Sequence, residues 1–291
     1  MLYQLFSVIA PVLTCAVIGY VWRKQGRPYD TSLVTTLVTN IGTPCLVFFT
    51  LIDTRIDADA FLSMGAAAFA SMVVFYAVYF IFLKAMKLSQ KAFLSALAYG
   101  NVGNMGLPLC LLAFGDQGLA LAIAYFTVNV ILLFTVGVAV PAGATSPGAL
   151  LRLPILYATL AALVFMATGW PVPEPVINTA RILSGLTVPL MLITLGVSLA
   201  GLGVKRVPQA VLLSVMRLGV GFLVGWGLAE AFGFTGAERG VLILQCAMPV
   251  AVFNFLFAER YGNQPEEVAG MVVISTVMSF ATLPFLLAFV M

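Results

Sequence analysis

The residues best suited to chemistry are carboxamides that lie inside apolar segments of the chain. Asn101 and Asn104 fall within residues 100–108, a stretch that also holds three glycines and a proline, and Gln245 lies just before Pro249. A carboxamide can donate hydrogen bonds to a carboxylate, or it can cap free N–H groups at the start of a helix. An unpaired polar group in hydrocarbon costs several kcal/mol, so these side chains predict either a ligand-binding site or structural caps.

The side chains on which enzymes and cation-coupled carriers depend are missing from the apolar segments. The chain has no histidine, and its eleven acidic residues fall in predicted loops or at segment ends: Asp30, Asp53, Asp57, Asp59, Asp116, Glu174, Glu230, Glu238, Glu259, Glu266 and Glu267. The four cysteines form no CxxC pair and are interpreted as buried thiols. We expect no metal, no cofactor and no catalytic centre. A carboxylate-based proton relay or sodium site is disfavoured, whereas a sodium site of backbone carbonyls stays open.

The composition places the chain among all-α integral membrane proteins. Of its 291 residues 62% are hydrophobic and 9% are charged, and its mean hydropathy is +1.10. Apolar segments of about 20 residues indicate helices and not barrel strands. The ten predicted spans are 2–22, 31–51, 61–83, 92–114, 118–140, 153–169, 177–199, 210–230, 239–258 and 267–290. The partners to expect are the lipid bilayer and a small solute, with no nucleic acid.

Two of these spans, 92–114 and 239–258, are predicted to be broken at mid-membrane. Discontinuous helices of this kind bind the substrate at the break in many transporters. The second half of each broken helix starts with free N–H groups and about +0.5 charge. The two starts approach the midplane from opposite sides, which predicts an anion site without a lysine. The alternative is that the two ends satisfy each other across a packed crossing.

The two halves of the chain carry the same pattern. Pro44 lies in the second span and precedes Gly100 by 56 residues, whereas Pro189 lies in the seventh span and precedes Pro249 by 60 residues. Five spans per repeat is an odd number, so the second repeat must be inverted relative to the first. We therefore expect one five-helix repeat over residues 1–140 and its inverted counterpart over residues 153–291, with broken helices 4 and 9 crossing.

These motifs resemble the auxin efflux carrier family, which includes plant PIN-like carriers and bacterial malonate-type carriers. Residues 100–109 are similar to its fourth helix, residues 189–200 to its seventh, and residues 245–261 to its ninth helix and the following loop. The chain departs from the plant members at Gly100 and Asn254, where they carry prolines. It also lacks their large loop between spans five and six.

The resemblance implies a fold like that of bile-acid symporters and sodium/proton antiporters. It also implies a scaffold domain from spans 1, 2, 6 and 7, and a transport domain from spans 3–5 and 8–10 that moves as an elevator. A homodimer through the scaffold is implied as well. Asn101 matches the substrate-binding asparagine of the plant carriers, and Gln245 matches a family glutamine.

The candidate substrate-binding residues gather around the predicted crossing and on the two spans nearest to it. They are Asn40, Thr43, Gly100, Asn101, Asn104, Ser184, Thr187, Gln245, Pro249 and Asn254. The hydroxyl groups in this set also suit a structural role, since Ser and Thr often join membrane helices. Arg217, inside span eight, is kept outside the set. It can extend to the cytoplasmic face or pair with the C-terminal end of a helix.

The leading functional hypothesis is a secondary transporter that exports a small organic anion across a bacterial inner membrane. With no acidic relay, the membrane potential is the simplest driving force, worth about 2.3 kcal/mol per charge per 100 mV. The second hypothesis is cation-coupled uptake of malonate or a related dicarboxylate, which the ion dependence of transport would distinguish. An intramembrane enzyme and a channel are disfavoured by the missing acid–base groups and by the broken repeats.

The loop cations predict the orientation. Ten of the fourteen follow the odd-numbered spans: Arg23, Lys24, Arg27, Lys84, Lys87, Lys91, Arg152, Lys205, Arg206 and Arg260. Three others, Arg55, Arg181 and Arg239, belong to the opposite side. Under the positive-inside rule both termini are then periplasmic. A Lys87→Cys variant should resist an impermeant thiol reagent on intact cells and react after permeabilisation; labelling from outside would reverse the assignment.

Overall fold

The computed structural model describes residues 2–54, 56–143 and 147–291, and Arg55 lies outside this part of the chain. The regular elements of the described residues are all helical. They are α1 (Leu2–Lys24), α2 (Thr31–Leu37), α3 (Thr43–Thr54), α4 (Ala58–Ala85), α5 (Gln90–Ala98), α6 (Leu107–Leu132), α7 (Val138–Ala142), α8 (Pro154–Thr168), α9 (Glu174–Gly201), α10 (Val207–Ala231), α11 (Gly236–Cys246), α12 (Val252–Tyr261) and α13 (Pro265–Val290). A 3₁₀ segment, Pro147–Arg152, precedes α8.

Seven stretches of the described chain are long and apolar enough to cross a membrane. This confirms the predicted class of all-helical membrane protein. The remaining predicted spans are divided or short: α5, α11 and α12 have 9, 11 and 10 residues, and α8 has 15. The fourth and fifth predicted spans run together in α6, where Gly115 leaves the helical path with φ 64° and ψ −157°.

The two predicted breaks lie side by side and pair through their backbones. The non-helical residues 99–101 and 249–251 run antiparallel, with a bridge between Gly100 and Val250. The Asn101 N–H donates to the Pro249 carbonyl at 2.7 Å, and the Ala251 N–H donates to the Tyr99 carbonyl at 3.3 Å. Proline has no N–H to lose, so Pro249 suits a position where helical bonding stops.

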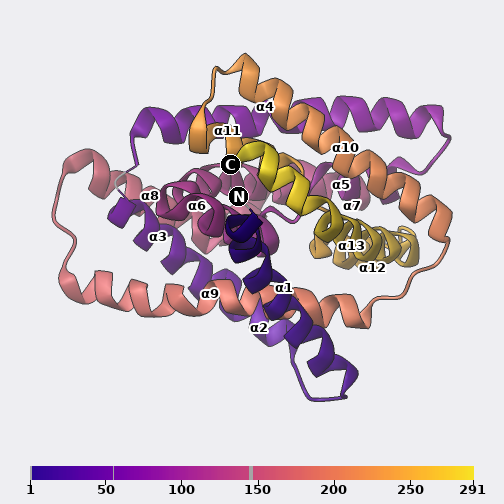
Figure 1. Ribbon diagram of the computed structural model, residues 1–291, viewed down its shortest axis with the longest axis horizontal. Helices are drawn as coiled ribbons and strands as arrows, with labels where there is room; N and C mark the ends of the chain where they lie inside the picture. The colour runs from indigo at the N-terminus through magenta and orange to yellow at the C-terminus, as the bar shows by residue number, and fades with distance from the viewer. Residues whose placement is uncertain (1, 55, 144–146) are drawn as a thin grey trace.

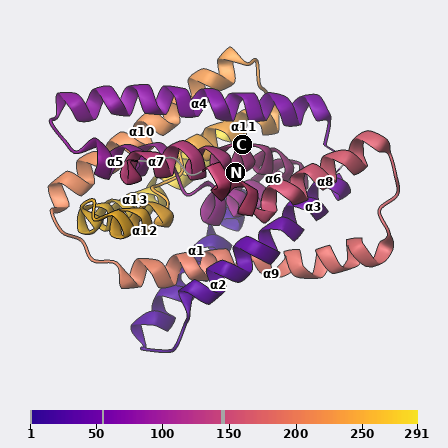
Figure 2. The same ribbon diagram turned by 180° about the vertical axis from the view of Figure 1, so that it is seen from behind.

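The long helices enclose these short segments. Figures 1 and 2 show α4 along one side of the molecule and α9 along the other, with α5, α6, α7 and α13 between them. Two groups of helices pack chiefly within themselves. In one, α1 packs on α9, and α3 packs on α8 and α9; in the other, α4 packs on α5 and α6, and α10 packs on α11 and α13.

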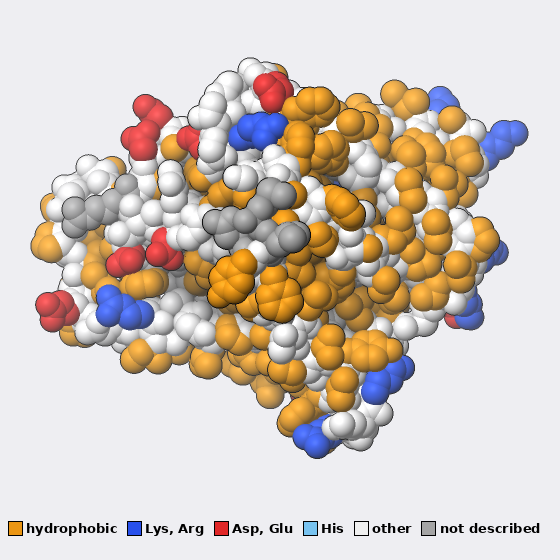
Figure 3. Space-filling model, in the orientation of Figure 1, with side chains coloured by type: hydrophobic (Ala, Val, Ile, Leu, Met, Phe, Trp, Pro, Cys, Tyr) orange, Lys and Arg blue, Asp and Glu red, His pale blue; other side chains and the backbone are white. Residues whose placement is uncertain are grey.

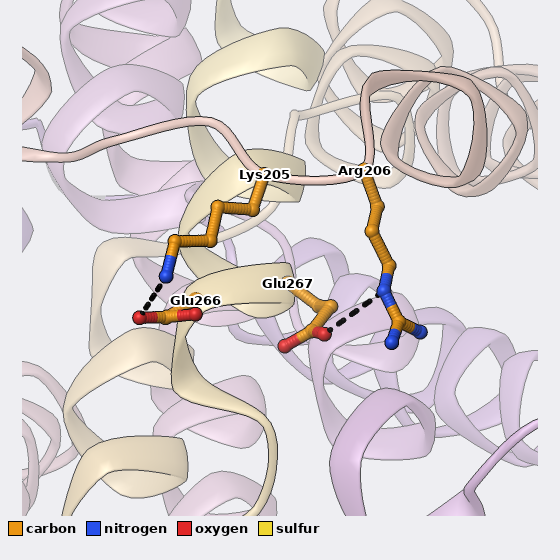
Figure 4. Close-up of polar contacts among 4 residues, drawn as sticks. All are labelled: Lys205, Arg206, Glu266 and Glu267. Carbon is orange, nitrogen blue, oxygen red and sulfur yellow. Dashed lines mark ion pairs between the residues drawn. The ribbon is translucent and has the colours of Figure 1, made fainter.

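On the face of the molecule shown in Figure 3, charge is divided along the long axis. In Figure 3 most Lys and Arg side chains lie toward the end where α4 finishes and α10 begins, while most Asp and Glu lie toward the opposite end. At the basic end the α9–α10 connection is tied to the start of α13 by two ion pairs, Lys205–Glu266 and Arg206–Glu267 (Figure 4). Exposed pairs of this kind contribute at most about 1 kcal/mol each.

The contact between α1 and α9 depends on a glycine. A Cβ atom at Gly196 would lie 1.8 Å from the Ala16 carbonyl oxygen, so the two backbones touch at this point. Such close approach is the usual reason for small residues between membrane helices. A Gly196→Ala substitution must push the helices apart.

We expect Gly196→Ala to lower the free energy of unfolding by about 1–3 kcal/mol, because overpacking forces backbone shifts. The measurement is thermal unfolding of the purified protein in detergent. Gly185→Ala is the matched control, since it makes the same change on α9 where a Cβ meets open space. Equal melting temperatures for the two variants would contradict the close contact.

Candidate functional site

A cavity of about 270 Å³ lies against the crossing, between the two groups of helices. From α2, α3, α8, α9 and the segments next to them it takes Thr35, Thr36, Val38, Thr39, Asn40, Thr43, Leu153, Pro154, Ile155, Met191 and Thr194. From the other group it takes Gly100, Asn101, Val102, Gly103, Asn104, Phe126, Asn129, Val130, Leu133, Phe134, Ala251 and Phe253. Its wall is therefore mostly apolar, with a few amides and hydroxyls.

Three π-helical turns in the described chain, Val38–Gly42, Val102–Gly106 and Leu133–Gly137, all contribute to this wall. In a π turn each backbone hydrogen bond joins residues five apart, instead of four apart as in an α-helix. Such turns are frequent at functional sites. The turn Val102–Gly106 begins at the crossing: the Met105 and Gly106 N–H groups both donate to the Asn101 carbonyl, at 3.3 and 3.0 Å.

Asn101 is a polar residue that belongs both to the crossing and to the cavity wall. It is 4% exposed, and its carboxamide Nδ2 has no hydrogen-bond partner among the described residues. A buried donor left unpaired destabilises a protein by about 1–3 kcal/mol, which a bound acceptor would offset. Asn101 thus supplies an unused N–H donor at the cavity wall.

The starts of both second half-helices also reach the cavity. Residues 102–104 line it from the fourth predicted span, and Ala251 and Phe253 line it from the ninth. The residues at the two N-caps, Asn101 and Ala251, make no side-chain capping bond in the described structure. The first N–H groups of a helix have no acceptor within the helix, and they carry its partial positive charge. The cavity therefore has two positive helix ends in its wall.

The sequence-based candidates divide into those at the cavity and those behind it. Gly100, Asn101, Asn104, Asn40 and Thr43 line the cavity. Pro249 lies behind the wall, where its carbonyl accepts from Asn101.

Four candidates make other contacts. The Asn254 Nδ2 donates to the Tyr99 carbonyl at 3.0 Å. Gln245 is buried against Gly106, and neither polar atom of its carboxamide has a partner within the described chain. The Ser184 and Thr187 hydroxyls donate to carbonyls of their own helix, those of Arg181 and Leu183, and Thr187 also packs against Gly42.

Several residues that line the cavity were not predicted from the sequence. Asn129 is buried and donates from Nδ2 to the Met72 sulfur at 3.6 Å. The hydroxyl residues Thr35, Thr36, Thr39 and Thr194 also line the cavity. A signal for part of this set existed, because three threonines and Asn40 cluster within six residues of an otherwise apolar span.

A second cavity, of about 380 Å³, adjoins the first and shares Thr35, Asn104 and Phe253 with it. It reaches Arg23 at the end of α1. The Tyr29 hydroxyl, on its wall, bonds to the Thr194 hydroxyl at 2.7 Å. Burial raises the Tyr29 pKa above its ordinary value, so this phenol stays neutral at physiological pH. The two cavities together connect the crossing with the basic end of the molecule.

Arg217 adopts one of its two expected roles: it pairs with helix C-terminal ends inside the protein. It is fully buried, and its guanidinium donates to the carbonyls of Leu97, Ala98, Cys246 and Met248. The first three carbonyls belong to the ends of α5 and α11, and Met248 lies two residues past α11, next to the crossing. The guanidinium also lies over the Phe75 ring, 5.0 Å from its centre.

Comparison with known proteins identifies the class. The chain matches the family described as "Membrane transport protein" twice, over residues 4–146 and 143–287. Since the two matches cover nearly the whole chain, the chain belongs to this family, that of the auxin efflux carriers, and the resemblance seen in the sequence is confirmed. It is a transport protein and not an enzyme.

The chain is similar to three relatives over nearly their whole length. The chain is 25% identical to an "Uncharacterized transporter" of Methanothermobacter thermautotrophicus, over 96% of each chain. It is 24% identical to another transporter with the same description from Methanocaldococcus jannaschii, over 94% of each chain. A Rhizobium meliloti protein named "Putative malonate transporter" is 25% identical, over 98% of this chain and 95% of its own.

Gly100 provides a test of the crossing. A Cβ atom there would lie 2.2 Å from the Arg217 Nη2 and 3.0 Å from the Met248 carbonyl oxygen, so Gly100→Ala must displace the guanidinium. We expect a loss of about 1–3 kcal/mol in the free energy of unfolding. Gly219→Ala, on the same helix as Arg217 and facing open space, is the control.

A double-mutant cycle of Gly100→Ala with Arg217→Ala makes the test specific. The two losses should be strongly non-additive, because the guanidinium is the group that the new methyl displaces. Additive losses would show that the two residues do not share this contact.

Proposed function

We propose that the protein is a secondary transporter of small organic anions, above all carboxylates, which bind in the cavity at the crossing of the broken helices. The observation that carries the proposal is the unpaired side-chain Nδ2 of Asn101. It is buried in the wall of a cavity that also holds two positive helix ends. A carboxylate oxygen accepts hydrogen bonds from amides and helix N-termini, whereas a cation finds no carboxylate partner there. Within the described chain no Asp or Glu is buried.

The proposed architecture has ten spans in two inverted five-helix repeats. The fourth span is α5 with the first part of α6, the fifth is the rest of α6 with α7, and the ninth is α11 with α12. The two family matches, one in each half of the chain, support the repeat. The first helix group, α1, α3, α8 and α9, would form a scaffold and the second a transport domain. A cavity between two groups of helices suits an elevator, because movement of one group carries the site across the membrane.

The proposed setting is a bacterial inner membrane with both termini periplasmic. The basic end of the molecule, which holds the α4–α5 and α9–α10 connections, would then face the cytoplasm. The two adjoining cavities lead toward that end, so this conformation would receive its substrate from the cytoplasm. Export of an anion from a negative interior proceeds with the membrane potential.

The alternative is cation-coupled uptake of malonate or a related dicarboxylate. The name of the Rhizobium meliloti relative favours it. The discriminating test uses proteoliposomes that contain the purified protein, a panel of radiolabelled mono- and dicarboxylates including malonate, and a potential set by potassium and valinomycin. Efflux that follows the potential and is unchanged when sodium is replaced by choline supports the leading proposal. Flux that requires a sodium or proton gradient supports the alternative.

Charge at Asn101 distinguishes an anion site from a cation site. We expect Asn101→Ala to weaken carboxylate binding by about 1–3 kcal/mol through the lost donor. Asn101→Asp should be weaker still, because the helix ends would stabilise its carboxylate in the place of the substrate. The measurement is the affinity of both variants for a transported carboxylate over a range of pH. Tighter binding by Asn101→Asp would overturn the anion site.

Leu186→Ala is a suitable control for these variants. Leu186 is exposed on α9 and lies outside both cavities. The affinity of the Leu186→Ala variant for the carboxylate should equal that of the wild type. A loss at this position would show that the assay reports general damage to the protein.

A further inference from the structure

We propose that Arg217 is a covalently held cation that occupies a cation site of the crossing, so that the transport cycle needs no bound cation. The inference deepens the proposed function, since it explains how an anion carrier can work without an ion partner. It rests on the contacts of one side chain and on the chemistry of the carbonyl groups around it.

The guanidinium lies where two helix ends bring negative partial charge together. Its Nε is 3.0 Å from the Met248 carbonyl oxygen, and its Nη2 is 3.1 Å from that of Cys246. Its Nη1 is 3.0 Å from the Leu97 carbonyl oxygen and 3.3 Å from that of Ala98. The last carbonyls of a helix lack intrahelical partners and carry about −0.5 charge per helix. Three such oxygens, together with the Met248 carbonyl two residues past α11, surround one point and form a site for a cation.

No acidic side chain balances this charge. Arg217 is the one charged residue that is fully buried in the described part of the chain, and no salt bridge to it is found there. A buried charge normally needs a partner of opposite sign. Here the two helix C-terminal ends take that role, together with the face of Phe75. A guanidinium cannot release its proton under protein conditions, so the charge is permanent.

The charge also reaches the cavity. Gly100 lines the cavity on one side and meets the Arg217 Nη2 on the other, closely enough that a Cβ would lie 2.2 Å from it. One residue without a side chain therefore separates the cation from a bound carboxylate. The carbonyl ends of the half-helices are neutralised by Arg217, while the N–H ends remain available to the anion.

The test removes the Arg217 guanidinium by substitution and measures whether free guanidinium binds in its place. Arg217→Ala leaves the four carbonyls with space between them, and Arg217→Met removes the charge but fills most of the space. Thermal unfolding of each purified full-length variant is measured with low millimolar guanidinium chloride, with urea as the control for denaturant effects. We expect guanidinium to raise the melting temperature of Arg217→Ala, and to do so for neither Arg217→Met nor the wild type.

Transport supplies the readout that a purely structural arginine would not change. Malonate flux into proteoliposomes should fall by at least about tenfold in Arg217→Ala, as expected for loss of charged hydrogen bonds. Guanidinium should restore it in that variant alone. Arg217→Lys keeps the charge and should show sodium-independent flux well above that of Arg217→Met, which keeps the test decisive if Arg217→Ala does not fold.

The outcomes separate this inference from the proposed function. The tethered cation would be overturned if guanidinium had no selective effect on Arg217→Ala. It would also be overturned if folded Arg217→Lys and Arg217→Met showed equal flux. Wild-type flux that requires sodium or a proton gradient would overturn its consequence for coupling. If the wild type moved none of the carboxylates, the proposed function would fail, while selective stabilisation of Arg217→Ala by guanidinium would still support the cation site.

Discussion

A helix that stops in the middle of a membrane leaves carbonyl groups without partners at one end and N–H groups without partners at the other. This protein contains two such breaks, and they lie against each other. Two backbone hydrogen bonds between residues 99–101 and 249–251 hold them together. The remaining free groups set the requirements for everything nearby, because each has to find a partner that lipid cannot provide.

The protein treats the two kinds of free end differently. The carbonyl ends of α5 and α11 receive Arg217, whose guanidinium comes from a third helix and is enclosed on all sides. The N–H ends face a cavity whose wall is mostly apolar. The polarity of the site follows from this asymmetry. Under the proposed function, a cavity whose neighbouring carbonyl ends are already paired with Arg217 binds a solute of opposite sign to the N–H ends that remain.

Close backbone contacts make this arrangement feasible. Gly100 lets the guanidinium reach the crossing, and Gly221 lets α10 approach α11, since a Cβ there would lie 2.3 Å from the Cys246 carbonyl oxygen. In the other helix group Gly196 brings α9 onto α1 in the same way. Each group is thus closely packed within itself, and the cavity occupies the space between the two groups.

The sequence allowed the membrane class, the positions of both breaks and the place of Asn101 at one of them to be predicted. These features are local: apolar length, glycine and proline within a span, and an amide at the break are visible in about ten consecutive residues. It did not separate Thr43, which reaches the cavity, from Thr187, whose hydroxyl bonds to its own helix. Both are threonines in apolar spans, and only the direction of the side chain differs.

The tertiary structure alone decided the role of Arg217 and the membership of the cavity. The carbonyls that bind Arg217 lie about 30 residues away in one case and about 120 in the other. Asn129 and Thr194 line the same cavity from different helix groups, although 65 residues separate them. Sequence patterns report the local backbone and its burial, whereas these contacts depend on how distant helices are oriented against each other. For that reason the sequence determined where the helices break, and the packing of the helices determined what surrounds each broken end.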